Sequence, residues 1–458
     1  MRLDPRTILQ EIAVHPRWRE LDAFTFLEPD IARRFDEGRS GAWPLVTTVP
    51  STLDRATLAG CQIVVKDNID VAGMPCTLGT PALRHHVATR DAVAIARLRA
   101  AGAEIVGKTN LHELAYGITS NNAAFGPVRN PHDLGCFAGG SSGGTAAAIA
   151  AGLVRAGLGT DTGGSSRIPA ALCGIVGFRP TVDRYPMGGV ALISPTRDVI
   201  GPMGRTVHDV AALDAVLAGT TQIGVDTVDL RAIRIGFPRQ HFQEDLDASV
   251  ADALERVASA LRQAGVTLVE ADLENVAAAD AAVSFPVVLY ETKAALETYL
   301  AGTGTGVTLA ALHAQIASAD VKEIMAQVIG GAIPEPVYRQ ALTVHRPALR
   351  TLYRDYFAKH RVEAMLLPTT PLPARPIEGS DRVVTLNGVD VPTFATYIRN
   401  TDPASNAGIP GISLPAGPHP PRDGAAARLP VGIELDGPEG TDRRLLAIAA
   451  AVESALNR

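Results

Sequence analysis

The sequence predicts an α/β protein built on one large sheet with helices on both of its faces. Three observations carry this prediction. Short β-branched runs alternate with helical segments from about residue 60 onward, glycine-rich turns follow several of these runs, and 46% of the residues are hydrophobic. Strands that alternate with helices in this way are joined by crossover connections, which place helices on the faces of the sheet.

The first 50 residues are expected to form a helical and looped N-terminal segment. Pro16, Pro29, Pro44 and Pro50 interrupt any longer element there. The alternation that follows predicts, in order, a strand at 61–65, a helix at 92–101, a strand at 104–106, a helix at 145–151, a strand at 156–158 and a helix from Ser165 or Ser166.

The second half of the chain continues the pattern with one change. Residues from about 275 to 360 are expected to be mostly helical, with Gly302–Gly306 as a break. The remaining predictions are a strand at 233–237, a helix at 246–264, strands at 266–270, 362–367, 412–414 and 431–435, a surface hairpin loop at 418–428 and a closing helix at 442–456.

Composition limits the classes of function. The 458 residues are expected to form a single domain, and the net charge of −6 includes no long basic or acidic block, so we expect neither a nucleic acid nor a membrane surface as partner. The four cysteines form no CxxC pair, and the first residues do not look like a signal peptide. We therefore expect a cytoplasmic protein that acts on a small molecule.

Ser165 is the first candidate for chemistry. It follows Gly163-Gly164 and precedes a helical segment, so the backbone N–H groups of Thr162, Gly163, Gly164 and Ser165 could stabilise an oxyanion, each by on the order of 3 kcal/mol. The alternative is that this loop only caps the helix, and the loop alone does not decide between the two.

Ser141 presents the same ambiguity. It also precedes a helix, and the run from Gly139 to Gly143 fits the G-x-S-x-G elbow of α/β-hydrolases. That elbow needs a strand directly before it, whereas residues 130–135 are typical of a turn. The run also lacks the Gly-Lys-Ser/Thr ending of a phosphate-binding loop.

Lys66 is a candidate for the base that activates a serine hydroxyl in these loops. It ends an apolar strand, where a buried lysine loses its proton readily and can then activate a serine hydroxyl. The commoner alternative is a lysine that reaches solvent from the end of a strand. Lys66 is favoured as a base because both serine loops follow neighbouring α/β elements, where open-sheet enzymes build their sites.

Three further side-chain groups complete the candidates. Asp161 and Arg167 flank the second loop and could form an ion pair that locks it. Cys173 lies in an apolar run and is expected to pack as a small hydrophobic side chain. The histidines show no metal-ligand spacing, so we expect no metal and no cofactor.

Together these motifs resemble the amidase signature family. The matching residues are Lys66, the run Gly139–Gly144 with Ser141, and the run Gly159–Ala170 with Ser165, and the resemblance continues through 173–181 and 201–209. It implies an α/β/α sandwich with a large mixed sheet, a single amidase domain over 1–458, a catalytic core at about 51–215 and a helical insertion on the substrate side at about 275–360.

The resemblance also implies roles for individual residues. Ser165 would attack the amide carbonyl, and Ser141, as the cis serine of a Ser-cisSer-Lys triad, would pass the proton to Lys66. Ala115 and Tyr116 look like neighbours of the acyl pocket. The runs 116–121 and 193–198 look like those of the indoleacetamide and mandelamide hydrolase branch, which implies a primary arylacetamide as substrate; a homodimer is compatible with this assignment.

Two alternatives stay open at this stage. The first is the A subunit of a glutamyl-tRNA(Gln) amidotransferase, which would release ammonia from glutamine and would need partner chains. The second is an α/β-hydrolase esterase that uses Ser141, with a histidine such as His208 or His345 as the base.

Overall fold

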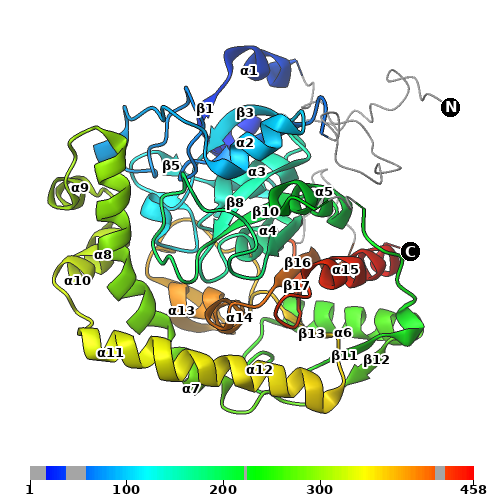
Figure 1. Ribbon diagram of the computed structural model, residues 1–458. Helices are drawn as coiled ribbons and strands as arrows, with labels where there is room; N and C mark the ends of the chain where they lie inside the picture. Colours follow the sequence, from blue (N-terminus) through cyan, green and yellow to red (C-terminus); the bar gives the residue numbers. More distant parts are fainter. Residues whose placement is uncertain (1–16, 38–57, 221–223, 418–428, 458) are drawn as a thin grey trace.

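One sheet of eleven strands forms the centre of the molecule (Figure 1). The computed structural model describes residues 17–37, 58–220, 224–417 and 429–457. In spatial order the strands are β1 (Phe24–Leu27), β3 (Glu104–Thr109), β2 (Gln62–Lys66), β8 (Ala156–Asp161), β10 (Val199–Gly204), β9 (Val176–Arg179), β16 (Gly411–Pro415), β17 (Gly432–Asp436), β13 (Ala364–Pro368), β11 (Arg234–Gly236) and β12 (Thr267–Val269).

The sheet is mixed, as expected. Strands β3, β2 and β8 pair in parallel near one edge, and β13, β11 and β12 pair in parallel at the other. The strands between them, from β8 to β13 through β10, β9, β16 and β17, pair antiparallel. Two of these parallel strands lead into the segments of the candidate site, since β2 ends at Lys66 and β8 ends at Asp161.

Helices cover both faces of the sheet. Strand β2 illustrates the division, because Ile63 and Val65 pack with α2 (Val93–Ala100) and α5 (Val207–Ala218), whereas Val64 packs with α3 (Gly143–Ala150) on the other face. Helices α6 (Ala248–Gln263) and α15 (Asp442–Leu456) pack with the strands in the second half of the sheet. The predicted sandwich of a mixed sheet between helices is therefore confirmed.

The N-terminal segment departs from its prediction as helix and loop. Residues 24–27 form strand β1, which pairs antiparallel with β3 at the edge of the sheet, and 29–36 form α1 (Pro29–Asp36), the α-helix among the described residues of this segment. A four-residue strand between prolines has too few residues to reveal a period of two, so the sequence did not show it. Residues 1–16 and 38–57 lie outside the described part of the chain.

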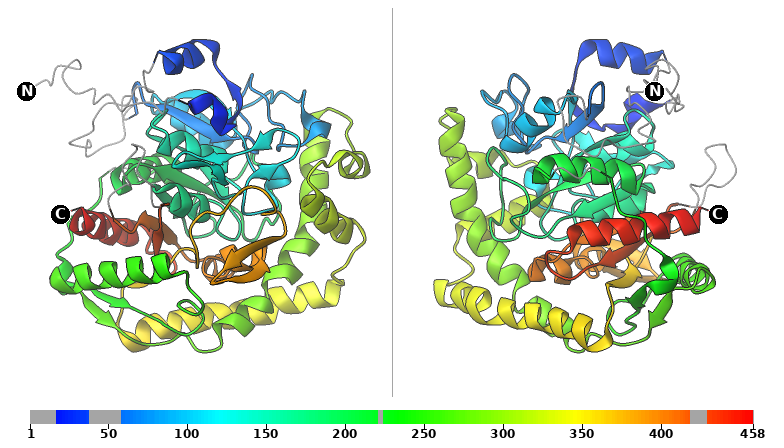
Figure 2. Two further views of the ribbon diagram at one scale, coloured as in Figure 1. Left: turned by 180° about the vertical axis from the view of Figure 1, so that it is seen from behind. Right: turned by 45° about the vertical axis from the view of Figure 1, so that its right-hand side comes forward.

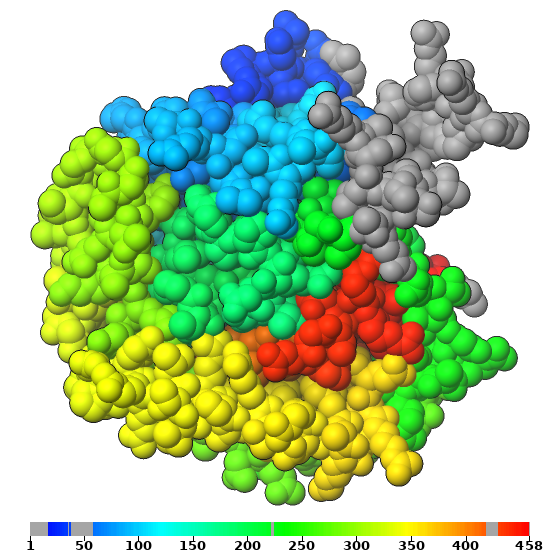
Figure 3. Space-filling model, in the orientation of Figure 1, coloured from blue at the N-terminus to red at the C-terminus, as the bar shows by residue number. Residues whose placement is uncertain are grey.

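Residues 275–360 are mainly helical, in agreement with the prediction. The elements are α7 (Val276–Ala281), α8 (Ser284–Thr303), α9 (Leu309–Gln315), α10 (Ala319–Ile329), α11 (Glu335–Gln340), a π-helical turn (Ala341–His345) and α12 (Arg346–His360). Helices α8 to α10 pack on Leu78, Leu114 and Ile193 of the central body. From α8 to α12 they follow one side and the lower edge of the molecule, coloured lime to yellow in Figure 3.

Several predicted strands are longer than the sequence indicated, and other elements were missed. Strand β3 extends to Thr109 and β8 to Asp161, because glycines at 107, 157 and 159 hid the continuation of each strand. Helix α4 (Arg167–Cys173) confirms the helix predicted from Ser165 or Ser166. The missed elements include helices α13 (Thr393–Ile398) and α14 (Asp402–Ala407), the hairpin of β14 (Val383–Leu386) and β15 (Val389–Pro392), the short pairs β4 (Asn121–Asn122) with β5 (Gly126–Pro127) and β6 (Arg129–Asn130) with β7 (Asp133–Phe137), and 3-10 turns at Trp18–Leu21, Pro81–Leu83, Glu113–Ala115 and Leu230–Ala232. The predicted loop at 418–428 lies outside the described residues.

Candidate active site

Lys66 ends strand β2 with its side chain fully buried. Its Nζ lies 2.8 Å from Oγ of Ser141 and 2.8 Å from Oγ1 of Thr160. Burial lowers the pKa of Lys66 to about 7, although Asp161 and Asp198 act in the opposite direction. Near pH 7 a large share of the molecules therefore carry a neutral amine at this position, which can accept a proton.

A second buried lysine lies on the adjacent strand and differs in its partners. The Nζ of Lys108 lies 2.9 Å from Oδ1 of Asp67 and 2.8 Å from the carbonyl oxygen of Pro75. Burial opposes the charge of Lys108, but nearby negative groups, Asp67 foremost, raise its pKa above the ordinary value. Of these two lysines, only Lys66 is suited to act as a base near neutral pH.

Ser141 lies in the glycine-rich loop between β7 and α3 and is fully buried. The peptide bond between Gly140 and Ser141 is cis. In the next residue, the N–H of Ser142 donates to the carbonyl oxygen of Ser165 at 3.2 Å, and its hydroxyl donates to the carbonyl oxygen of Thr160 at 3.2 Å. The two serine loops identified in the sequence are thus joined by a direct hydrogen bond.

Ser165 lies between β8 and α4 and differs from the other two residues in its exposure. Its exposed fraction is 7%, whereas Lys66 and Ser141 are at 0%. Within the described part of the chain its hydroxyl has no hydrogen-bond partner. The residue that precedes α4 is Ser166, whose side chain makes no capping bond, so the loop is more than a helix cap.

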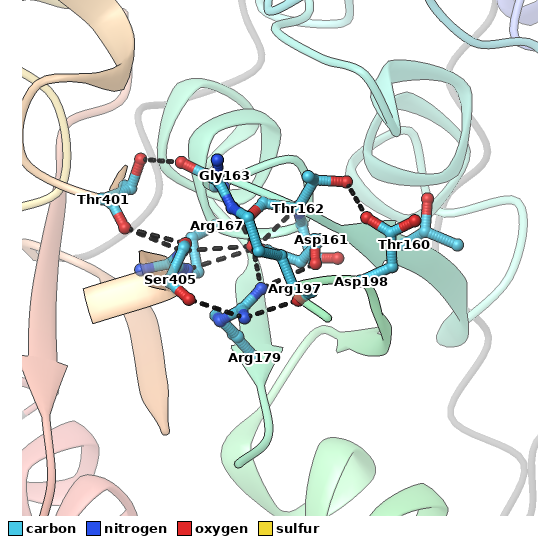
Figure 4. A network of polar contacts seen from close by, with 12 residues as sticks. Thr160, Asp161, Thr162, Gly163, Arg167, Arg179, Arg197, Asp198, Thr401 and Ser405 are labelled. Atoms are coloured by element: carbon cyan, nitrogen blue, oxygen red, sulfur yellow. Dashed lines mark hydrogen bonds and ion pairs between the residues drawn. The ribbon is translucent and has the colours of Figure 1, made fainter. Parts of the chain in front are cut away.

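A buried ion-pair network fixes the loop that carries Ser165 (Figure 4). Asp161 accepts hydrogen bonds from Nε and Nη2 of Arg167, both at 3.1 Å, and from Nη1 of Arg179 at 3.0 Å. Burial alone would raise the pKa of Asp161, but the two guanidinium groups hold it below its usual range. The predicted pair of Asp161 and Arg167 is confirmed, and it is buried rather than solvated.

The same carboxylate organises the backbone on both sides of Ser165. Asp161 accepts from the N–H of Gly164 at 2.9 Å and from the N–H of Ser166 at 3.1 Å. Gly164 therefore has no free N–H in this structure, which removes it from the four predicted oxyanion donors. Among the described residues, the N–H groups of Thr162, Gly163 and Ser165 have no recorded partner.

Two residues that the sequence analysis missed hold the peptide groups of this loop. Nη2 of Arg197 donates to the carbonyl oxygen of Thr162 at 3.3 Å, and Oγ1 of Thr401 donates to that of Gly163 at 2.6 Å. In a trans peptide the C=O and N–H point in opposite directions, so Arg197 turns the N–H of Gly163 away from itself. Arg197 lies in the run 193–198 that carried the family resemblance, whereas nothing near Thr401 in the sequence pointed to this loop.

The two predicted pocket residues lie in the loop after β3. Ala115 is buried and has a φ of 60°, and the hydroxyl of Tyr116 lies 2.6 Å from Oγ1 of Thr292 on α8. This contact ties the loop to the helical segment 275–360. The role of Ala115 and Tyr116 beside the acyl group stays a prediction.

The elbow interpretation of Ser141 does not agree with the structure. The hydroxyl of Ser141 contacts Lys66 and not a histidine, while His208 is exposed on α5 and His345 is partly exposed before α12. The prediction of a turn at 130–135 was wrong in part, because 133–137 form strand β7. That strand pairs with the two-residue strand β6 and bridges to Pro376, outside the large sheet, so the strand-to-helix elbow of α/β-hydrolases is not formed.

The described residues form neither a metal-binding cluster nor a membrane-spanning helix. No group of three or more His, Cys, Asp or Glu side chains is placed to hold a metal ion within the ranges that the structure describes. Among the helices of those ranges, none has the length and apolar character needed to cross a membrane.

A cavity of about 800 Å³ lies between α8 and the central body, separate from these serines. It lies where the lime, blue and green segments meet in Figure 3, and its lining includes His86, Gly188, Tyr290, Tyr299 and Tyr338. Lys66, Ser141 and Ser165 do not line it, so its position does not alter the assignment of the candidate site.

Comparison with known proteins identifies the family of the chain. The model of the amidase family matches residues 47–446. The chain is 46% identical to an indoleacetamide hydrolase of Agrobacterium vitis (87% of this chain, 84% of the relative) and 42% identical to a mandelamide hydrolase of Pseudomonas putida (88% and 80%). A crystal structure of an amidase superimposes with a TM-score of 0.78 at 32% identity (96% and 93%).

Sequence, fold and site geometry therefore lead to one assignment. A match over most of the chain together with relatives above 40% identity is sufficient to establish the family. The chain belongs to the amidase signature family, in the branch of the indoleacetamide and mandelamide hydrolases, and is an amide-hydrolysing enzyme.

Proposed function

We propose that the enzyme hydrolyses a primary arylacetamide to the carboxylate and ammonia, with Ser165 as nucleophile, Ser141 as proton carrier and Lys66 as base. The observation that carries the proposal is the 2.8 Å distance between Nζ of the buried Lys66 and Oγ of Ser141, in a site where none of the described carboxylates forms an ion pair with that lysine. Ser165 is the least buried of the three, at 7% exposed against 0% for the other two, which supports its contact with substrate.

Acylation begins with a proton transfer. The neutral amine of Lys66 takes the hydroxyl proton of Ser141 while Ser141 takes that of Ser165, whose Oγ forms a bond to the amide carbon. The carbonyl oxygen then carries the negative charge, and the N–H groups of Thr162, Gly163 and Ser165 stabilise it.

Collapse of the tetrahedral intermediate completes this step. The proton returns from Lys66 through Ser141 to the amide nitrogen, the C–N bond breaks, and ammonia leaves an ester on Ser165. The same two groups then deprotonate a water that attacks the ester carbon. The C–O bond to Ser165 breaks, Ser165 regains a proton from Lys66 through Ser141, and the carboxylic acid is released and loses its remaining proton to solvent.

The choice of acyl group rests on the relatives. The two hydrolases with identities above 40% are named for indoleacetamide and for mandelamide, both of which join an aromatic ring to a short carboxamide. These names support an arylacetamide rather than glutamine as the substrate of this chain. A cytoplasmic location and a homodimer remain predictions.

The experiment is ammonia release by the purified chain alone. We expect turnover of indole-3-acetamide, phenylacetamide and mandelamide, and little or none of glutamine. Ser165→Ala should abolish release while circular dichroism stays that of the unaltered protein. Turnover of glutamine that depends on added partner chains, or activity that survives in Ser165→Ala, would contradict the proposal.

A further inference from the structure

Two exposed aromatic side chains lie next to each other beside the Ser165 loop. Phe285 on α8 is 46% exposed and Phe394 on α13 is 40% exposed. Their ring centroids are 6.1 Å apart with an interplanar angle of 46°. Single exposed aromatic residues are common, but a contacting pair from segments more than 100 residues apart forms a small apolar surface of its own.

Helix α13 connects this pair to the nucleophile loop. Ile398 at the end of α13 lies against Gly163, where a side-chain carbon added to the glycine would be only 2.8 Å from Cδ1 of the isoleucine. Phe394 precedes Ile398 by four residues and so lies on the same face of the helix, about 6 Å along its axis. An apolar strip therefore runs outward from Gly163 over Ile398 to Phe394.

Helix α8 is fixed to the same loop at its first residue. The carbonyl oxygen of Ser284 accepts from Nη1 of Arg197 at 3.0 Å, and Arg197 also binds the carbonyl oxygen of Thr162. The hydroxyl of Ser284 donates to Asp402, which pairs with Arg197. Phe285 is the next residue on α8. It therefore directly follows Ser284, which contacts the groups that hold the nucleophile loop.

The beginning of α8 thus lies beside α13 and the hairpin β14–β15, although these segments are far apart in the sequence. Both ribbon views show the orange α13 region next to α8, in front and from behind (Figures 1 and 2). Arg197 links the start of α8 to the carbonyl oxygen of Thr162, and Ile398 of α13 packs against Gly163, so both helices that carry the rings adjoin the loop at 162–163.

We propose that Phe285 and Phe394, with Ile398 between Phe394 and the loop, form the subsite that binds the aryl group of the substrate. This inference rests on the proposed arylacetamide hydrolysis and names the residues that select the ring. Edge and face contacts with aromatic rings favour a planar aromatic acyl group. A two-ring indolyl group extends further along the strip than a phenyl group. It therefore gains more binding free energy from contact with Phe394.

The test measures kcat and KM separately for indole-3-acetamide, phenylacetamide and propionamide. Phe285→Leu and Phe394→Leu should each raise KM for indole-3-acetamide by roughly three- to tenfold, with a smaller rise for phenylacetamide and little change in kcat. Propionamide, which has no ring, should be hydrolysed equally by all of these proteins. Phe394→Tyr, which keeps a ring, should restore the KM for indole-3-acetamide.

Val389→Ala serves as the matched control, because Val389 is 62% exposed on the neighbouring strand β15 and has no place in the subsite. Unchanged KM for indole-3-acetamide in both leucine variants would overturn this inference and leave the proposed function intact. Failure of the unaltered enzyme to hydrolyse any arylacetamide would overturn both. An equal fall in kcat/KM for all three amides would mean that the two rings support the structure of the site and do not bind the aryl group. That result would also overturn the subsite.

Discussion

The Nζ atom of Lys66 and the Oγ atom of Ser141 lie 2.8 Å apart, between two side chains with no exposed surface. This contact joins a base whose pKa is lowered to about 7 to a hydroxyl that has no access to solvent. This difference in burial, with Ser141 at 0% and Ser165 at 7% exposed, supports the proposal that Ser141 carries protons and Ser165 binds substrate.

Single replacements within the triad should have large effects that do not add. We expect Ser165→Ala, Ser141→Ala and Lys66→Ala each to lower kcat by at least about a thousandfold, because each change interrupts one relay. The double variant Ser141→Ala/Lys66→Ala should be no slower than the worse single variant within about threefold. Losses that multiply in the double variant, measured as kcat for phenylacetamide, would argue against a shared relay.

The pH dependence of kcat/KM should follow the neutral form of Lys66. Since the pKa of this lysine is lowered to about 7, the base is protonated below that value and free above it. The rate should fall about tenfold for each pH unit below 7 and level off above it. A flat profile from pH 5 to 9, with stability checked over the same range, would exclude Lys66 as the base.

The two buried lysines should respond oppositely to removal of their charge. Lys108→Met leaves Asp67 buried without its cation and should lower the free energy of unfolding by about 3–5 kcal/mol. Lys66→Met removes an amine that is costly to bury as a cation, so stability should be unchanged or higher, with activity lost.

The lowered pKa of Lys66 also predicts how the stability difference between Lys66→Met and the unaltered protein changes with pH. Between about pH 7 and 10.5 the unfolded chain binds a proton that the folded protein does not, so the cost of burying Lys66 falls as pH rises. The stability gained in Lys66→Met should therefore be larger at pH 6 than at pH 9, as measured by urea denaturation. A larger gain at pH 9 would contradict the lowered pKa.

The carboxylate of Asp161 should be needed for both folding and turnover. Asp161→Asn keeps the shape but removes the charge that faces Arg167 and Arg179, so we expect a loss of about 3–5 kcal/mol in unfolding free energy and at least a hundredfold in kcat. Asp229→Asn, which breaks an exposed pair with Arg231, is the control and should leave both quantities unchanged. Full activity in Asp161→Asn would mean that the loop holds its shape without this network.

The sequence pointed to Lys66, Ser141 and Ser165 as site candidates, but it did not point to Thr401, which holds the Ser165 loop from far along the chain. Lys66, Ser141 and Ser165 lie in distinctive local runs, and the alternation of strands and helices identified the elements around them. Arg197 and Thr401 act on the loop from far along the chain, through contacts that exist only once the sheet has formed. No local pattern encodes such contacts.

The same limit explains two errors in the predicted donors and elements. Gly164 appeared free in the sequence, but its N–H is bound by the Asp161 carboxylate three residues earlier. Strand β1 has four residues and is stabilised by pairing with β3, which lies some 80 residues later in the chain. In both cases the deciding contact forms only in the folded protein: a hydrogen bond for the Gly164 N–H, and strand pairing for β1.

The assignment of the nucleophile is tested most directly by finding which serine forms the covalent bond. The enzyme is treated with a fluorophosphonate, digested, and the modified peptide is sequenced by mass spectrometry. We predict a single adduct on Ser165, lost in Ser165→Ala and formed more slowly below pH 7. An adduct on Ser141, or no modified serine in an enzyme that is active on phenylacetamide, would contradict this account.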